Sequence, residues 1–213
     1  MSNLASITAS RLRIAAAVPL QHLSTSSKPP GNDYNYDEAY KNFTWDVPEG
    51  FNFAQDVIDK HAAGELKDRT ALLLVGEDGK TETKLSYSDL SRRSKEVAVS
   101  LNSLGKISRA VTVLPKVPEW WLLNVAALRT GTVLLPGTTL LTAADIAARI
   151  DKSESDCVIG DAEVAAKVEA EKHGKHLRHK ILVTTGDSGR EADLVDKHGW
   201  VPLNDLGSNL VLP

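Results

Sequence analysis

The sequence predicts an α/β fold in which a mainly parallel sheet carries helices on both faces. Two observations support this prediction. From about residue 106 onward, short apolar runs alternate with stretches of helical periodicity, as in repeated strand–helix–strand units. The short runs are apolar at nearly every position, which is typical of strands buried on both faces.

The composition is that of an ordinary globular protein, with 25% charged and 42% hydrophobic residues among 213. The net charge of -3 gives no electrostatic reason to expect nucleic acid or an anionic membrane as a partner. The single cysteine, Cys157, excludes an internal disulfide and any metal site that needs two thiolates. No apolar stretch approaches the roughly 20 residues that a membrane-spanning helix needs, so we expect no membrane span.

Residues 1–30 differ in kind from the rest of the chain. They contain no acidic residue, three basic residues (Arg11, Arg13 and Lys28) and many serines and threonines, as mitochondrial transit peptides do. The serine run before Pro29 predicts a processing and linker zone. We therefore expect import into the mitochondrial matrix. The alternatives are a tail without a targeting role and a secretory signal, for which the apolar stretch is weak and interrupted.

Residues 31–65 are expected to form an N-terminal arm and a helix. Aromatic residues are frequent over residues 35–52, which favours an extended arm lying on a domain surface. Phe53, Val57 and His61 then recur at helical spacing, so the sequence predicts a helix that ends near residue 63.

Residues 66–206 are expected to form the α/β subdomain. It opens with a hairpin, because the apolar run Ala71–Val75 and the segment Thr81–Tyr87 flank a Glu-Asp-Gly turn. Ser88 is the expected N-cap of the next helix, which Gly105 ends. The later elements alternate: strand Ala110–Leu114, helix Pro118–Leu128, strand Val133–Leu135, a helix from Thr142 to Ile150, strand Cys157–Ile159, a helix from Asp161 to about His173, and strand Ile181–Thr184.

Ligands of open parallel sheets bind outside the carboxyl ends of the strands, and one such end carries paired tryptophans. The segment Leu114–Trp121 reads LPKVPEWW, a rigid corner at the start of a helix. Neighbouring helical residues point in different directions, so we expect one of Trp120 and Trp121 on the sheet. The other would face a ligand or an adjoining domain. Core packing of both side chains is the alternative.

A second corner follows the next strand. Pro136 and Gly137 are expected to end that strand, and Gly137 allows close approach of the backbone. Thr138 adds a hydroxyl group at the same corner. The two corners are the candidate ligand-facing positions.

Other signatures of chemistry are weak. No phosphate loop of the P-loop or dinucleotide type occurs, and no nucleophile elbow. Residues 76–80 fit a hairpin turn, and residues 185–189, which could offer amides to an anion, fit a surface loop. His173, His176 and His179 could share a helical face, but the interleaved lysines and arginines repel a cation. A solvated basic helix end is favoured there. We expect no catalytic residue and no metal ligand.

The two corners resemble the N-terminal region of medium-chain acyl-CoA synthetases, which belong to the adenylate-forming enzymes. Phe51–Asp59 and Ala144–Ile150 are similar to the same family, and the resemblance runs in order from Tyr34 to Leu206. It implies the N-terminal subdomain of that fold. It also implies a reaction in which a carboxylic acid, ATP with Mg, and CoA give acyl-CoA, AMP and pyrophosphate. The resemblance places six residues on the substrate or CoA side: Trp120, Trp121, Pro136, Gly137, Thr138 and Leu140.

The resemblance also implies that the reaction depends on residues outside the matched region. In the family these are a phosphate loop ending in Pro-Lys, a Mg-binding glutamate, a ribose-binding aspartate and a lysine of a mobile C-terminal domain. The 213 residues contain no such set. We therefore expect this chain by itself to bind ATP, Mg and CoA without high affinity and to lack ligase activity.

Three departures from the family pattern occur, and two of them, the tail and Leu140, favour an alternative. Residues 106–109 replace a Gly-Asp pair, and residues 207–213 form an atypical tail. Leu140 stands where relatives carry a glutamine near CoA, and a leucine cannot make the hydrogen bonds of that glutamine. The alternative function is a non-catalytic binding or regulatory module of the same fold. An unrelated dinucleotide-binding enzyme is a third hypothesis, which the missing glycine fingerprint disfavours.

Overall fold

The structure, a computed structural model, describes residues 35–45, 47–76, 78–186 and 188–206. The predicted transit peptide and linker and the atypical tail lie outside the described residues. The chain divides into two compact units, of which the second begins at Pro48. We describe each unit by itself.

The described part of the first unit contains the helix α1 (Tyr36–Asn42). The prediction of an extended arm is therefore wrong for these residues. The side chain of Asn35 accepts a hydrogen bond from the backbone N–H of Glu38 at 3.2 Å and caps the helix. Asp37 in the first turn and Lys41 in the last complement the helix dipole. These local signals outweigh the aromatic composition.

The second unit contains a five-stranded parallel sheet, which confirms the main fold prediction. The strand order is β4-β3-β5-β6-β7, and every neighbouring pair is parallel. The strands are β3 (Arg109–Val113), β4 (Val133–Gly137), β5 (Cys157–Gly160), β6 (His179–Leu182) and β7 (Val201–Pro202). The chain moves from β3 to β4 on one side and then to β5 on the other. The order therefore reverses between β3 and β5, which makes this the topological switch point of the sheet.

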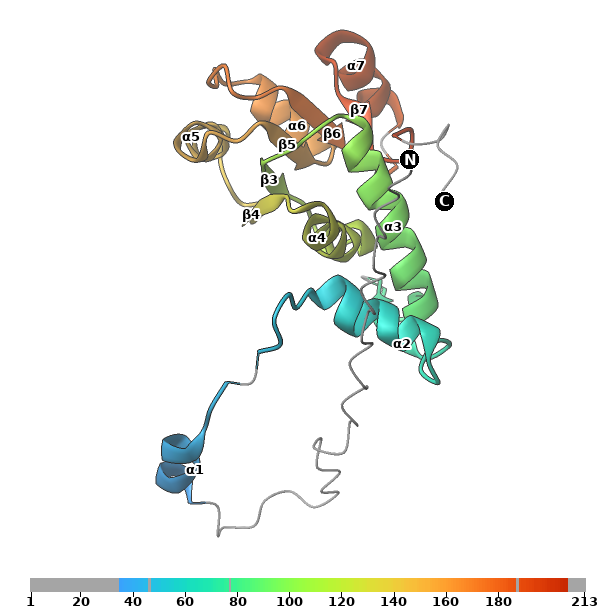
Figure 1. Cartoon of the computed structure of the whole chain (residues 1–213). Coiled ribbons are helices and arrows are strands. Elements are labelled where there is room, and N and C mark those ends of the chain that lie inside the picture. Colours follow the sequence, from blue (N-terminus) through green and yellow to red (C-terminus); the bar gives the residue numbers. More distant parts are fainter. Residues whose placement is uncertain (1–34, 46, 77, 187, 207–213) are drawn as a thin grey trace, which may run out of the picture. The chain divides into compact units, whose positions relative to one another are not determined.

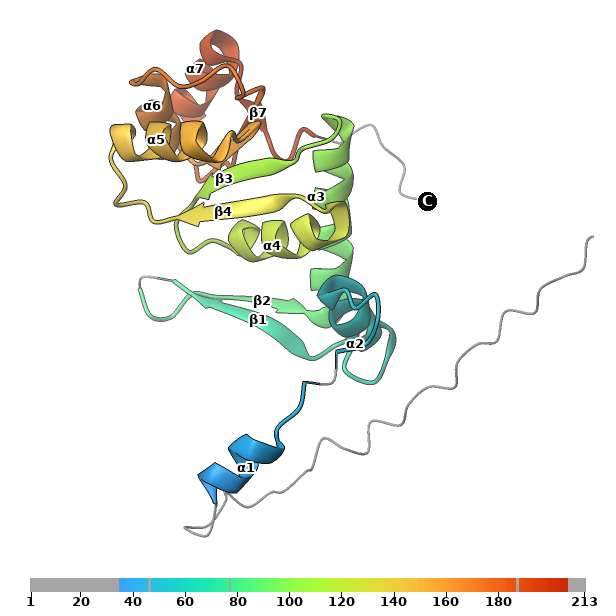
Figure 2. The same ribbon diagram turned by 60° about the vertical axis from the view of Figure 1, so that its left-hand side comes forward.

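Helices cover both faces of this sheet (Figures 1 and 2). On one face α3 (Tyr87–Ser103) and α4 (Pro118–Thr130) pack against alternate strand residues such as Ala110 and Ile159. On the other face the intervening residues, such as Val111 and Val158, meet three further helices: α5 (Ala143–Ser153), α6 (Ala162–Glu169) and α7 (Ser188–His198). Burial on both faces explains why the strands read as continuous apolar runs.

The predicted hairpin lies on the far side of α4 (Figure 2). Its strands, β1 (Thr70–Val75) and β2 (Glu82–Ser86), are antiparallel, as expected. The helix that was predicted to end near residue 63 is present. It begins as the π-helical η1 (Ala54–Asp59) and continues as α2 (Lys60–Ala63). Leu122 and Val125 of α4 pack into the hairpin cluster, while Leu123 and Ala126 pack toward the sheet. Helix α4 is therefore buried on two sides.

Two predicted boundaries need correction. The N-cap of α3 is Ser86 rather than Ser88: the Ser86 hydroxyl accepts from the backbone N–H of Asp89, whose carboxylate accepts from the Ser86 N–H. Strand β4 also continues through Pro136 and Gly137 instead of ending before them. Because β4 is an edge strand, Pro136 can stand in it without leaving a neighbour's hydrogen bond unmade.

The predicted helix from Asp161 to about His173 is shorter than expected, and the predicted basic helix end is wrong. Helix α6 ends at Glu169, and β6 begins already at His179, so the three histidines share no helical face. Gly174 donates its backbone N–H to the carboxylate of Asp151, which fixes the connecting loop. No helix in the described part of the chain combines the length and hydrophobicity that crossing a bilayer requires.

Candidate substrate-facing edge of the sheet

The two predicted corners lie at the same edge of the sheet because they follow neighbouring parallel strands. Val113, which ends β3, is the direct partner of Gly137, which ends β4. The loop after β3 leads into α4, and the loop after β4 leads into α5. The carboxyl edge of the sheet therefore presents both corners on one side, beside the switch point.

The paired tryptophans stand in the first turn of α4. Their ring centroids are 4.7 Å apart and their planes meet at 78°, an edge-to-face arrangement. Trp120 is partly buried against the cluster formed by the sheet, α3 and α4. Trp121 is 50% exposed. One tryptophan packs on the core and the other reaches the surface; contact of Trp121 with a ligand or another domain stays a prediction.

Both tryptophans line an apolar pocket of about 410 Å³ between α4, η1 and the hairpin. Most of its walls are aliphatic or aromatic, including Leu72 and Tyr87. The amide of Asn124 also lines it and donates to the carbonyl of Trp120 at 2.7 Å. Apolar walls with one polar group are typical of pockets for small apolar ligands.

The second corner is a tightly packed turn. A Cβ on Gly137 would lie 2.6 Å from Cδ1 of Leu141 and 3.1 Å from Cγ2 of Val113, so any larger residue here would require the Leu141 side chain to move. Leu141 donates its N–H to the carbonyl of Thr138 at 3.1 Å, and Leu140 donates its N–H to the Thr138 hydroxyl at 3.3 Å. The Thr138 hydroxyl is thus used inside the turn. The side chain of Leu140 is 86% exposed.

Helix α6 holds this turn from the side. The ammonium group of Lys167 donates to the carbonyl of Thr139 at 2.9 Å and lies 3.0 Å from the carboxylate of Glu163. The sequence carried no signal for this contact, because Lys167 is a surface-type residue 28 positions away from its partner. After the turn, Thr142 and Asp145 form the capping box of α5, which confirms Thr142 as its N-cap.

The six predicted residues thus fall into two groups. Trp120 and Trp121 belong to the pocket on the α4 side of the sheet. Pro136 is exposed on the edge strand, and the turn after it leads to the opposite face, where Leu135 and Leu141 line a pocket of about 440 Å³ beside α5. The sheet edge brings the two groups to one side, but the tryptophans line the pocket beside α4, whereas the pocket beside α5 is lined by Leu135 and Leu141, the neighbours of the second group.

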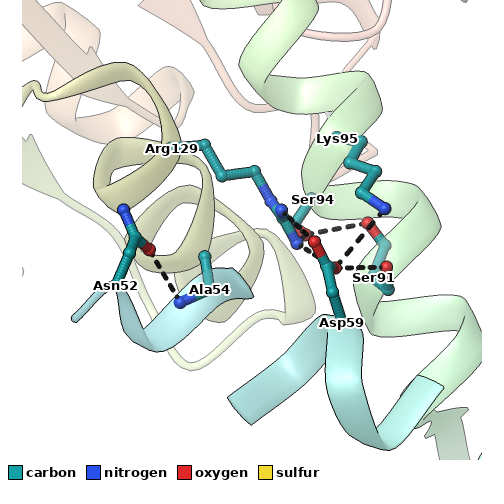
Figure 3. Close-up of polar contacts among 7 residues, drawn as sticks. All are labelled: Asn52, Ala54, Asp59, Ser91, Ser94, Lys95 and Arg129. Atoms are coloured by element: carbon teal, nitrogen blue, oxygen red, sulfur yellow. Dashed lines mark hydrogen bonds and ion pairs between the residues drawn. The ribbon is translucent and has the colours of Figure 1, made fainter. Parts of the chain in front are cut away.

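A polar cluster that the sequence did not reveal joins η1, α3 and α4 (Figure 3). The guanidinium group of Arg129 donates to both carboxylate oxygens of Asp59, at 2.7 and 2.8 Å, and to the Ser94 hydroxyl at 3.1 and 3.2 Å. The Ser91 hydroxyl donates to Asp59 at 2.6 Å, and Lys95 lies 3.5 Å from the same carboxylate. The bidentate geometry is the strong form of this ion pair.

The cluster keeps Asp59 charged. The hydrogen bonds from Arg129 lower the pKa of Asp59 to about 2, against the opposing effect of partial burial. The Asp59 side chain is 24% exposed and that of Arg129 14%. A carboxylate that is charged and paired at neutral pH suits a structural link better than a proton-transfer role. Sequence reasoning missed the pair because 70 positions separate its members.

Two of the backbone amides that could bind an anion after β6 already bind a carboxylate of the same chain. The backbone N–H groups of Thr185 and Gly186 donate to one carboxylate oxygen of Glu191, at 2.8 and 3.2 Å. Helix α7 begins at Ser188, so a helix does start within the segment that was predicted to be a surface loop. The turn at residues 76–80 connects the two hairpin strands, as predicted.

Among the described residues, no three His, Cys, Asp or Glu side chains lie close enough together to hold a metal ion. Magnesium bound with ATP takes only one or two carboxylates besides the phosphates, so weak binding of Mg-ATP by this chain stays a prediction. Cys157 is fully buried, and burial raises the pKa of its thiol above the ordinary value, which makes it a poor nucleophile.

Comparison with known proteins identifies the family. A family model described as "AMP-binding enzyme" matches residues 59–206. Acyl-coenzyme A synthetase ACSM3, mitochondrial, of Homo sapiens is 36% identical over 203 residues, which are 92% of this chain and 33% of that protein. Human ACSM4, mitochondrial, is 37% identical over 178 residues, or 74% and 30% of the two chains. This chain spans about a third of the length of these relatives.

Solved structures share the fold. The acyl-CoA synthetase of Brucella canis superposes with a TM-score of 0.56 at 23% identity, over 73% of this chain and 28% of that one. The anthranilate CoA ligase AuaEII in complex with anthranoyl-AMP gives a TM-score of 0.58 at 17% identity, over 75% and 27%. The predicted resemblance to acyl-CoA synthetases is confirmed, and the chain belongs to the AMP-binding enzyme family.

Proposed function

We propose that this chain forms the α/β subdomain of an ATP-dependent acid–CoA ligase of the medium-chain acyl-CoA synthetase type. The complete reaction would convert a carboxylic acid, ATP and CoA into acyl-CoA, AMP and pyrophosphate. The observation that carries the proposal is the 36% identity to human ACSM3 over 92% of the chain. The parallel sheet, with two loops meeting at its carboxyl edge, is compatible with a ligand-facing role for that edge.

In this proposal the chain supplies the walls of the site and other residues supply the chemistry. Trp121, exposed at the mouth of an apolar pocket, would meet the substrate or an adjoining domain. The turn from Pro136 to Leu140 would border the CoA side, where Leu140 offers apolar contact but no hydrogen bond. Adenylyl transfer needs groups that position the phosphates and neutralise their charge. The 213 residues contain no phosphate loop of the family type, so we propose that they are inactive alone.

A segment exchange tests the proposal. Residues 48–206 would replace the matching segment of human ACSM3, and thioester formation from octanoate, ATP and CoA would be measured. We expect the exchanged protein, called the ACSM3 chimera below, to keep ATP-dependent ligase activity. A chimera with the circular dichroism spectrum and monomer mass of the parent enzyme, but without thioester formation, would contradict the proposal.

A non-catalytic binding or regulatory module is the second candidate, and the exposed Leu140 favours it. A leucine there removes a polar contact while the surrounding turn is kept. Isothermal titration of the 213-residue chain with CoA, AMP and octanoyl-CoA distinguishes the two functions. Micromolar affinity without turnover, together with an inactive chimera, would support the module.

We also propose that residues 1–30 direct the protein to the mitochondrial matrix, as the names of its mitochondrial relatives suggest. A fluorescent protein carrying residues 1–30 should enter the matrix of isolated, energised mitochondria. Replacing Arg11 and Arg13 by glutamate should abolish import, because the membrane potential draws a positive segment inward. Import that survives this change would argue against the assignment.

A further inference from the structure

The turn between β4 and α5 is fixed at both ends and carries two local hydrogen bonds in the middle. At one end, Gly137 packs against Val113. At the other end, the capping box of Thr142 starts α5. Between them the N–H groups of Leu140 and Leu141 donate to Thr138, while the 86% exposed side chain of Leu140 adds little packing.

The middle of the turn is held by a contact from another element. The carbonyl of Thr139 accepts a hydrogen bond from the Lys167 ammonium group at 2.9 Å. A charged donor makes this bond stronger than an ordinary hydrogen bond between neutral groups. In the part of the chain that the structure describes, this hydrogen bond ties the main chain at Thr139 to helix α6.

Lys167 projects from a rigid base. Its helix, α6, buries Val164, Ala165 and Val168 almost completely in the core of that face. The Lys167 side chain is 27% exposed, whereas its other partner, Glu163, is 68% exposed. An ion pair this exposed contributes little to stability, so the contact with Thr139 is the one with structural consequence.

We propose that Lys167 is a positioning residue of the ligase: it holds the Thr139 carbonyl and thereby fixes the turn that borders the CoA side. This proposal rests on the proposed function of the carboxyl edge. Lys167 does not touch the reacting atoms; it acts through the main chain of the turn. Its loss should loosen the turn without unfolding the domain, because the core contacts of α6 stay in place.

Hydrogen exchange on the 213-residue chain tests the contact between Lys167 and the Thr139 carbonyl, called the clamp below, without requiring enzymatic activity. In Lys167→Met, the amides of Leu140 and Leu141 should exchange about tenfold faster, which is the size of effect that losing one good hydrogen bond produces. Lys167→Arg should restore slow exchange, because arginine keeps the charged donor. Glu163→Gln is the matched control and should leave both amides unchanged. Unchanged exchange in Lys167→Met, or equal acceleration in Glu163→Gln, would overturn the clamp.

Kinetics of the ACSM3 chimera test the consequence for the reaction. Lys167→Met in the chimera should raise the KM for CoA by up to about tenfold and lower kcat much less, and Lys167→Arg should rescue it. Equal KM values for CoA in the ACSM3 chimera and in its Lys167→Met variant would overturn the positioning role, even if the Leu140 and Leu141 amides exchange faster in the variant. An inactive parent chimera would instead count against the proposed function, while the exchange measurement would still decide on the clamp.

Discussion

The pair Asp59–Arg129 ties together three segments that are far apart in sequence (Figure 3). We expect Asp59→Asn to lower the free energy of unfolding by about 2–3 kcal/mol, because it leaves a largely buried guanidinium group without its charged partner. Lys95→Met is the control: Lys95 is half exposed and lies 3.5 Å from Asp59, so its loss should cost less than about 1 kcal/mol. Equal effects of the two changes in urea unfolding would contradict this ranking.

The same pair should make stability depend on acid pH. The pKa of Asp59 is lowered to about 2 in the folded state, so its stabilising effect is complete above its ordinary value of 3.8 and is lost as the pH falls toward 2. After allowance for solvent screening we expect about 1–2 kcal/mol. Measured between pH 5 and pH 2, the wild type should lose that much more stability than Asp59→Asn. Parallel pH profiles would contradict the assignment.

Single residues were predictable where their partners are local. Pro118 at the first turn of α4, Gly131 after its end and Thr142 as N-cap follow from helix geometry alone. Asp59 and Lys167 were not predictable, because their partners come from elements that only the tertiary fold brings near. In the sequence, a charged residue that makes such a contact looks the same as a charged residue exposed to solvent.

At the scale of elements, Gly160 at the end of β5 packs closely against the helix that follows it, α6. A Cβ there would lie 2.6 Å from Cγ1 and 2.9 Å from Cβ of Val164. We expect Gly160→Ala to destabilise the chain by about 2–3 kcal/mol, since overpacking in a rigid core forces the helix outward. In Gly189→Ala the new Cβ would meet nothing within 4 Å. This control should be neutral or slightly stabilising in thermal unfolding.

The elements that sequence reasoning missed have different physical causes. Helix α1 depends on capping by Asn35 and charges near its ends, which the aromatic composition obscured. Strand β4 tolerates Pro136 only because it lies at a sheet edge, and edge position is a property of the whole sheet. The early end of α6 leaves room for a loop that Gly174 and Asp151 fix.

At the scale of the whole molecule, the second unit presents large apolar side chains at its surface, among them Trp121 and Leu128. The two are seven positions apart on α4 and both line the apolar pocket. We expect the 213-residue chain to associate with increasing concentration, because exposed apolar patches favour association. Sedimentation velocity should show this, and replacing both residues by serine should reduce it. A monodisperse monomer with a sharp, reversible thermal transition would contradict this expectation.

The layered architecture followed from the alternation of strands and helices, and the structure confirms it. The strand order did not follow, because strand pairing depends on contacts between distant segments. The candidate site was predicted only as two corners. Both lie at the carboxyl edge, but the tryptophans lead to the face covered by α4 and the second corner leads to the face covered by α5, which only the tertiary fold decides.

Thioester formation by the purified 213-residue chain tests the central claim most directly. The chain would be incubated with octanoate, Mg-ATP and CoA, with human ACSM3 as the positive control. We expect no octanoyl-CoA above background, because in the proposed function the groups that hold the triphosphate against the carboxylate are not among these residues. Octanoyl-CoA produced in proportion to the amount of this chain would contradict the claim.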